Sequence, residues 1–140
     1  MGLDEAMTER LVAGIGFRRG TGADEIAALI TRALGQIGVG RADLTAIATV
    51  ADRAVEPAIA GAAAQFGLSP RPVDADALAA RDAELVTRSA RVERLRGVGS
   101  VAEAAALAVA GPGSRLALPR IASGGATCAL AVGQTTIPTA

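Results

Sequence analysis

The sequence of 140 residues contains no histidine, lysine, tryptophan or tyrosine. The absence of histidine excludes His-based catalytic triads, histidine metal sites and a histidine axial ligand to a bound metal. The absence of lysine excludes Schiff-base chemistry and makes all 14 basic residues arginine. An arginine side chain is a planar fork of donors that binds carboxylates and phosphates well. Any cationic side chain that this protein offers to a ligand is therefore a fork of this kind.

Aromatic residues, cysteine and net charge are also scarce. Phe17 and Phe66 are the only aromatic residues, and the 14 basic residues are balanced by 14 acidic ones. Such a composition lacks the basic surface and stacking side chains of nucleic-acid binders. The single cysteine, Cys128, cannot form an internal disulfide, which agrees with a reducing compartment.

The chain also lacks long hydrophobic runs. No apolar stretch approaches the roughly 20 residues of a membrane span. The first ten residues, MGLDEAMTER, carry acids where a signal peptide would carry a basic region. We therefore expect a cytoplasmic protein that binds neither membranes nor nucleic acid.

Apolar residues make up 51% of the chain, which is enough to bury one sizeable core. The length predicts a single domain, residues 1–140. Hydrophobic periodicity and helix-terminating glycines and prolines predict helices at 24–36, 57–66, 76–80, 90–96 and 101–110. Short apolar runs predict strands at 11–17, 44–50, within 69–75, at 115–122 and at 127–133, and the tail 134–140 is expected to be loose.

This alternation predicts an α/β fold with three layers, α/β/α. We expect a mostly parallel, mixed sheet of about five strands, with helices on both faces. The short turn at 123–126 predicts a C-terminal antiparallel hairpin, because two strands joined by so few residues must run in opposite directions. We place the antiparallel strand at one edge of the sheet.

The first candidate site is the segment GIGFRRGTG, residues 14–22. A glycine-rich loop between a strand and a helix is where α/β proteins bind anions, which makes Gly14, Gly16, Arg18 and Arg19 candidates. The dinucleotide fingerprint is incomplete, because Arg19 occupies the third glycine position, and the Walker pattern is absent. The alternative is a close-packed turn with two exposed arginines.

The second candidate site is ADRAVEP, residues 51–57. If the first two strands are parallel neighbours, Asp52, Arg53 and Glu56 lie at the same sheet edge as the two arginines of the first loop. A polar cleft there could use the two carboxylates as acid and base, provided that burial separates their pKa values. The alternative is a solvated loop or a structural ion pair.

The third candidate is GVGSVAEAAAL, residues 97–107. Ser100 and Glu103 have the spacing of a capping box, in which each side chain bonds a backbone N–H of the other residue. Gly97 and Gly99 can serve as a helix stop and a tight link, or can present N–H groups to an anion. The pattern favours the cap. Arg120, before the hairpin turn, is either a ligand-binding cation or a surface arginine that protects an edge strand.

The motifs GIGFRRG, TVADRAVEP, GVGSVAEAAAL and LPRIASGGATCALAV, in that order, resemble the family formed by the CobE proteins and the C-terminal domain of CbiG, which act in cobalamin biosynthesis. The resemblance covers about residues 11–132. Members commonly carry Cys in place of Phe17 and Lys in place of Arg19, Arg53 and Arg120. The N-terminal region of the longer CbiG proteins, which are associated with opening a precorrin lactone, is not part of this chain, so that activity is not expected.

The resemblance implies a protein of corrin-ring biosynthesis that binds a carboxylate-rich corrinoid or precorrin intermediate. The expected binding residues are Gly14, Gly16, Arg18, Arg19, Arg53, Gly97, Gly99, Ser100 and Arg120. No metal or other cofactor is expected. One alternative is an enzyme that hydrolyses or rearranges a precorrin with Asp52 or Glu56 as general base. Another is a non-catalytic carrier that passes intermediates between enzymes of the pathway. A nucleotide-binding domain comes last, because neither nucleotide fingerprint is intact.

Overall fold

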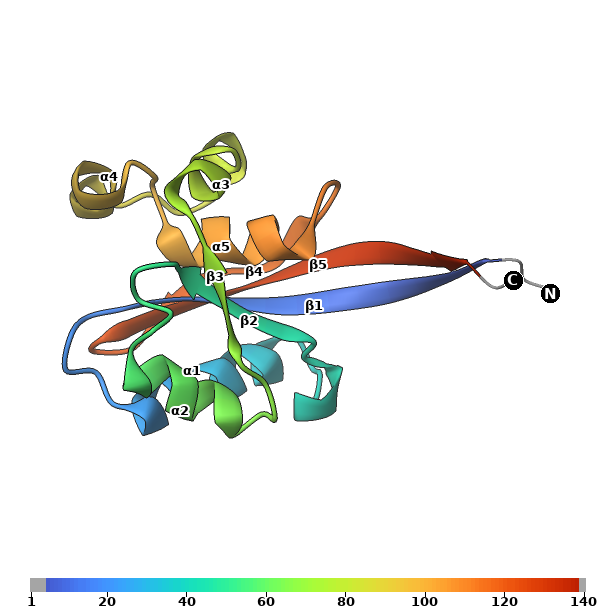
Figure 1. Ribbon diagram of the computed structural model, residues 1–140, viewed down its shortest axis with the longest axis horizontal. Helices are drawn as coiled ribbons and strands as arrows, with labels where there is room; N and C mark the ends of the chain where they lie inside the picture. Colours follow the sequence, from blue (N-terminus) through green and yellow to red (C-terminus); the bar gives the residue numbers. More distant parts are fainter. Residues whose placement is uncertain (1–4, 139–140) are drawn as a thin grey trace.

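The computed structural model describes residues 5–138 (Figure 1). Its strands are β1 (Glu5–Phe17), β2 (Ala46–Val50), β3 (Pro70–Val73), β4 (Arg115–Ala122) and β5 (Ala126–Pro138). Its helices are α1 (Ala23–Gln36), α2 (Pro57–Ala64), α3 (Ala75–Ala79), α4 (Ala90–Arg96) and α5 (Val101–Ala110), with 3-10 turns η1 (Arg41–Asp43) and η2 (Asp82–Glu84). The predicted elements are all present, and their order along the chain is as predicted.

The five strands described form one mixed sheet in the order β3-β2-β1-β5-β4. β1 pairs in parallel with β2, and β2 with β3, whereas β5 is antiparallel to both β1 and β4. The α/β class, the mixed sheet and the C-terminal hairpin are therefore confirmed. The position of the antiparallel strand is wrong: β5 lies inside the sheet and β4 is the edge, because the last strand of the hairpin pairs with the free side of β1.

The expectation of a loose tail is also wrong for residues 134–138. β5 continues to Pro138 by pairing with the start of β1, from Gln134 opposite Glu9 to Pro138 opposite Glu5. Before Leu11 in β1 and after Val132 in β5, the two strands form a ribbon that extends past the rest of the sheet (Figure 1). Two strands can continue in this way because each pairs with the backbone donors and acceptors that face it on the other strand.

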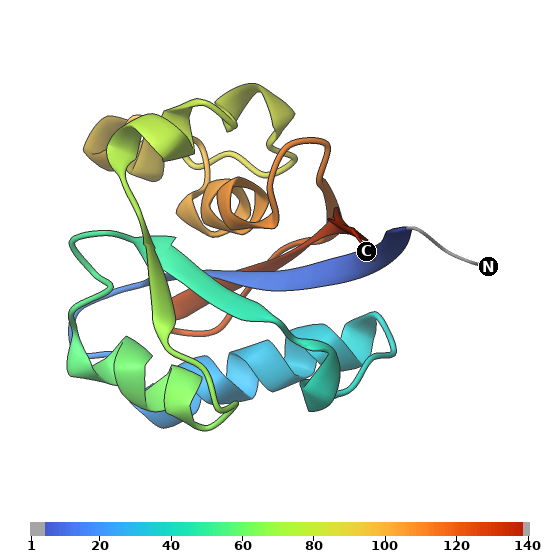
Figure 2. The ribbon, with the colours of Figure 1, turned by 45° about the vertical axis from the view of Figure 1, so that its right-hand side comes forward.

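Helices cover both faces of the sheet, as predicted. α1 and α2 lie on one face, and α3, α4 and α5 lie on the other (Figures 1 and 2). The face under α1 and α2 buries a core of branched side chains that includes Ile15, Ile26 and Ile59. The face under α5 buries mostly small residues, among them Ala104, Ala105 and Ala106. No helix among residues 5–138 combines the length and the apolar character that crossing a membrane requires.

The small residues let α5 approach the sheet very closely. A Cβ atom added at Gly14 in β1 would lie 1.9 Å from the carbonyl oxygen of Ala102 and 2.6 Å from the backbone nitrogen of Ala106. A Cβ added at Gly133 in β5 would lie 2.2 Å from the carbonyl oxygen of Ala110. Glycine is therefore required at both positions because the backbone of α5 occupies the space of a side chain.

The carboxyl edge of the sheet, defined as the end where β1, β2 and β3 finish, gathers segments that are distant in sequence. β5 begins there, because Ala126 pairs with Phe17 at the end of β1, and β4 ends there at Ala122. The start of α5 also lies at this edge, since a Cβ on Gly16 would be 3.9 Å from the Cβ of Val101. The loops 18–22, 51–56 and 123–125 thus lie at the same end of the sheet as the N-terminus of α5.

Candidate functional site

The backbone of the loop after β1 is bound to the β4–β5 turn, and the two arginine side chains of this loop are exposed. Arg18 N–H donates to the carbonyl of Gly125 at 2.9 Å, and the hydroxyl of Thr21 donates to the same carbonyl at 3.0 Å. Glu25, in the first turn of α1, accepts from the N–H of Gly125 at 2.7 Å. These bonds fix the loop against the β4–β5 turn. The side chains of Arg18 and Arg19 are left exposed at the carboxyl edge.

The loop after β2 carries two ion pairs at the same edge. Asp52 Oδ2 accepts from Arg96 Nη1 at 2.7 Å, and this contact joins the end of α4 to the end of β2. Arg53 Nη1 donates to Glu56 Oε2 at 2.7 Å, three residues along the loop. The guanidinium of Arg53 also lies 5.6 Å from the ring centre of Phe17, within cation–π range. The ion-pair alternative for this loop is therefore what the structure contains.

Asp52 is the carboxylate around which the arginines of the edge gather. Its pKa is lowered from the ordinary value, first by the hydrogen bond from Arg96, against the opposing effect of partial burial, and further by the charges of Arg96, Arg53 and Arg19. A general base works best when its pKa is close to the working pH. A lowered pKa makes Asp52 a poor general base. The arginines that lower it also give the surroundings of Asp52 an excess of positive charge.

At the start of α5, the polar groups mainly cap the helix and are not left free to bind an anion. Ser100 is fully buried, and its Oγ accepts from the N–H of Glu103 at 3.3 Å. Gly97 ends α4 with a φ of 77°, a conformation that favours glycine, and its N–H donates to Glu93. The N–H of Gly99 donates to Asp82 Oδ1 at 2.9 Å. The N–H groups of the two glycines are thus used within the chain, and the glycines shape the backbone.

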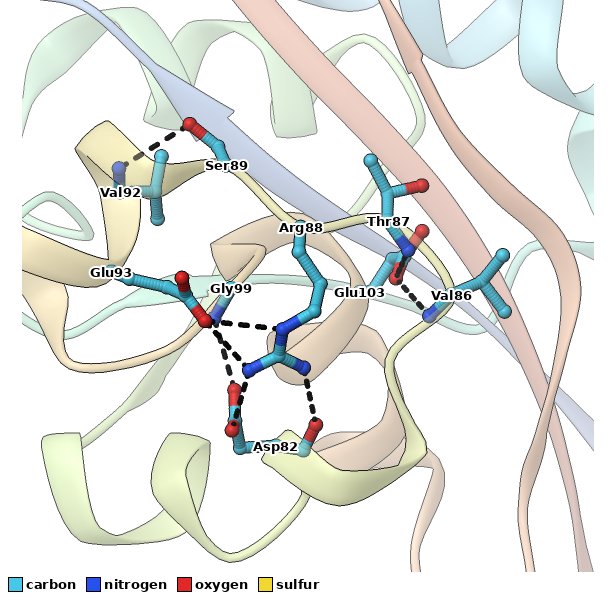
Figure 3. A network of polar contacts seen from close by, with 9 residues as sticks. All are labelled: Asp82, Val86, Thr87, Arg88, Ser89, Val92, Glu93, Gly99 and Glu103. Carbon is cyan, nitrogen blue, oxygen red and sulfur yellow. Dashed lines mark hydrogen bonds and ion pairs between the residues drawn. The ribbon is translucent and has the colours of Figure 1, made fainter.

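Glu103 does not complete the predicted capping box. It is fully buried, and its carboxylate points across to other segments: Oε1 accepts from the N–H groups of Val86 and Thr87, each at 2.9 Å, and Oε2 accepts from the N–H of Arg120 at 2.9 Å. Figure 3 shows the carboxylate under the chain at Val86 and Thr87. Glu103 therefore joins α5, the segment before α4 and strand β4.

A second polar cluster holds the segment before α4 (Figure 3). The guanidinium of Arg88 pairs with Asp82 at 2.9 Å and with Glu93 at 2.7 Å. Ser89 caps α4 by accepting from the N–H of Val92 at 3.3 Å. The pKa of Asp82 is lowered, first by the hydrogen bond from Arg88 and then by the N–H of Gly99. These contacts fix the entry and exit of α4, a helix without a buried residue.

The remaining residues predicted to bind a ligand, Gly14, Gly16 and Arg120, differ in how far they are buried. Gly14 lies beneath α5 and does not face solvent. Gly16 is half-buried beside Thr127, and Arg120 is half-buried in β4, where its backbone N–H is bound by Glu103. The structure thus brings Arg19, Arg53 and Asp52 together, and it adds Arg96, which the sequence analysis did not single out. A basic last turn in a predicted helix was the only available signal for Arg96.

A surface hollow of about 410 Å³ lies at the other end of α5. Its lining consists of Ala77, Ala80, Arg81, Glu84, Ala108, Gly111, Pro112 and Gly113. The guanidinium of Arg81 is already used there, since it donates to the carbonyls of Leu107 and Gly111 and is paired with Glu84. This hollow is separate from the carboxyl edge because it lies at the C-terminal end of α5, a helix about 15 Å long.

Comparison with known proteins shows the family to which the chain belongs. A family profile described as Cobalamin synthesis G C-terminus matches residues 11–131, most of the chain. The chain belongs to this family. It is a cobalamin biosynthesis protein, as the resemblance of its four motifs implied.

Individual members agree with this assignment. A curated protein of Sinorhizobium sp., Protein CobE, is 42% identical over 121 residues, which cover 86% of this chain and 79% of that protein. The crystal structure of a CobE protein from the cobalamin biosynthetic pathway superposes with a TM-score of 0.83 at 32% identity and covers 94% of both chains. The cobalamin biosynthesis protein chiG of Agrobacterium tumefaciens gives a TM-score of 0.68 at 36% identity, over 86% of this chain and 96% of that one.

Proposed function

We propose that this protein binds a carboxylate-rich corrinoid or precorrin intermediate at the carboxyl edge of its sheet. The observation that carries the proposal is the group of arginines around Asp52. The pKa of Asp52 is lowered by Arg96, Arg53 and Arg19, so that three guanidinium groups act on one carboxylate. Intermediates of corrin-ring synthesis carry acetate and propionate groups around the ring, and forked guanidinium donors bind carboxylates strongly.

The charges at this edge are not evenly distributed. Around the loops after β1 and β2, Arg18, Arg19, Arg53 and Arg96 supply four positive charges, against two negative charges from Asp52 and Glu56. Elsewhere along the edge, Glu25 of α1 and Asp74 after β3 add two negative charges. A surplus of positive charge raises the local concentration of an anionic ligand and speeds its association. The protein as a whole is neutral. The local surplus therefore belongs to the arginines around the loops after β1 and β2.

Apolar side chains accompany the arginines and suit the flat face of a corrin ring. Val55, between Arg53 and Glu56 in the loop after β2, is 83% exposed. Leu95, next to Arg96 in α4, is 68% exposed. A ring face covered by these residues and a rim held by the arginines would use both parts of the edge.

Titration with hydrogenobyrinic acid, followed by absorbance, tests the proposal. We expect Arg19→Ala and Arg53→Ala each to weaken binding about tenfold, the value of one charge-assisted hydrogen bond. Arg115→Ala is the matched control, because Arg115 is exposed at the opposite end of the sheet, where it pairs with Val132. No binding at micromolar concentration, or equal loss in the control, would show that the edge is not the binding site.

The proposal does not include a reaction. The two candidate bases are each held by an arginine, Asp52 by Arg96 and Glu56 by Arg53, both at 2.7 Å. The lowered pKa of Asp52 makes this carboxylate a weak proton acceptor. We therefore expect mass spectrometry to recover the bound intermediate unchanged. A product of different mass would favour the alternative of an enzyme.

A further inference from the structure

Asp52 is a carboxylate that an arginine of the carboxyl edge already binds. Its Oδ2 lies 2.7 Å from Arg96 Nη1, and the charges of Arg53 and Arg19 also act on it. Glu56, the other carboxylate of the loop, is paired with Arg53, three residues away in the same loop. Asp52 differs because its partner lies 44 residues away, on a separate helix.

We propose that Asp52 is an internal substitute for a ligand carboxylate, which holds Arg96 in the free protein and is displaced when a ligand binds. This inference rests on the proposed function and names how the same site is regulated. Arg96, released from Asp52, then forms the same type of ion pair with a carboxylate of the ligand. Binding exchanges one carboxylate for another, so Arg96 has a carboxylate partner in both states.

The geometry allows this exchange. The side chain of Asp52 is 65% exposed and that of Arg96 is 27% exposed, so water can replace either partner. Exposed ion pairs contribute little to stability, which makes them easy to break. α4, which carries Arg96, has no buried residue and is held mainly by polar contacts of its flanking segments. Its last turn can therefore follow a ligand without disturbing a hydrophobic core.

Comparison with Glu103 shows why Asp52 can be displaced by a ligand and Glu103 cannot. Both are carboxylates of the same region, but Glu103 is fully buried and accepts three backbone N–H groups at 2.9 Å. Displacing Glu103 would leave three donors unpaired, whereas displacing Asp52 frees only a guanidinium that the ligand immediately binds. Of these two carboxylates, Asp52 alone is both exposed and held by a cation.

The test compares two variants of the same ion pair. Asp52→Asn removes the competing carboxylate, and we expect hydrogenobyrinic acid to bind about two- to fivefold more tightly, the range that an exposed ion pair of ordinary strength provides. Arg96→Gln breaks the same pair but removes a ligand-binding cation, and we expect weaker binding. Asp52→Glu retains the negative charge, and we expect its affinity for hydrogenobyrinic acid to be close to that of the unaltered protein.

Two controls accompany the variants. Asp43→Asn changes the net charge equally but lies before β2, at the far end of that strand, where Asp43 caps the turn η1. We expect it to leave affinity unchanged. Cyanocobalamin, whose corrin ring carries amides in place of free carboxylates, should gain nothing from Asp52→Asn. Thermal unfolding of each variant confirms that it folds, and Asp52→Ser replaces Asp52→Asn if that variant does not fold.

The outcomes separate the inference from the proposed function. Opposite shifts in the two single variants support the substitute role. Weaker binding in both shows that the ion pair is only a structural link, and this overturns the inference while the proposed function stands. Unchanged affinity in Asp52→Asn overturns it equally. Failure of the unaltered protein and of all variants to bind overturns the proposed function and the inference with it.

Discussion

The buried carboxylate of Glu103 gives the sharpest test of how the site is supported. Glu103 is fully buried, and its two oxygens accept three backbone N–H groups from Val86, Thr87 and Arg120. Glu103→Gln retains the size of the side chain but replaces one acceptor oxygen with a donor. The amide can keep its oxygen toward Val86 and Thr87, in which case its NH₂ group faces the N–H of Arg120.

The expected cost follows from these contacts. One lost hydrogen bond to a charged group, with an unpaired donor left behind, costs about 1.5–3 kcal/mol. The two remaining bonds weaken because the acceptor is no longer charged. Removing the buried charge recovers part of this loss. We expect Glu103→Gln to lower the free energy of unfolding by about 2 kcal/mol, and Glu103→Leu, which loses all three bonds, by about 4 kcal/mol.

Chemical and thermal denaturation measure these changes. A loss of about 2 kcal/mol corresponds to a decrease in Tm of roughly 4–8 °C for a chain of this size. Hydrogen exchange adds a local test, because the amide of Arg120 should lose protection first. Glu93→Gln is the control: Glu93 is an exposed glutamate that pairs with Arg88, and its loss should cost less than about 1 kcal/mol. Equal stability of Glu103→Gln and the unaltered protein would refute the reasoning.

Three further predictions concern packing, reactivity and pH. Gly14→Ala should cost about 3 kcal/mol or more, because its Cβ would lie 1.9 Å from backbone of α5, whereas Gly16→Ala should cost about 1 kcal/mol, because it meets a hydroxyl that can rotate; denaturation curves compare the two. Cys128 should resist thiol reagents until the protein unfolds, because burial is complete and raises its pKa to about 12; labelling at the rate of an exposed thiol would contradict this. The lowered pKa of Asp52 stabilises the fold above its ordinary pKa of 3.8 and ceases to do so as pH falls through the lower folded value. Asp52→Asn should therefore remove a small part of the acid-induced loss of stability below about pH 4, measured by denaturation against pH, and an unaltered acid profile would show that the pair with Arg96 does not form in solution.

Much of the local structure could be predicted because its causes are local. Gly97 was expected to end one helix, and it adopts the positive φ that glycine favours. Ser100 was expected to begin the next helix, and its hydroxyl accepts the N–H three residues on. In both cases the interacting groups are a few residues apart, so the backbone conformation alone brings them together.

The partners of Glu103 and Asp52 could not be predicted in this way. The capping-box spacing indicated that Glu103 would bond to the start of its own helix, but its three donors lie 16 and 17 residues away on either side. Asp52 meets an arginine 44 residues further along the chain. Such contacts depend on where the chain returns to the sheet edge, and no pattern within one segment contains that information.

The alternation of strands and helices and the helix ends can be read from the amino-acid sequence, because propensity and capping act within a few residues, and composition alone restricts every cationic side chain to arginine. In contrast, the place of β5 inside the sheet, the packing of α5 against Gly14 and the contact of Arg96 with Asp52 depend on the three-dimensional fold. Strand order fixes these relations, and strand order is set by the burial of whole faces of the sheet against helices from distant parts of the chain.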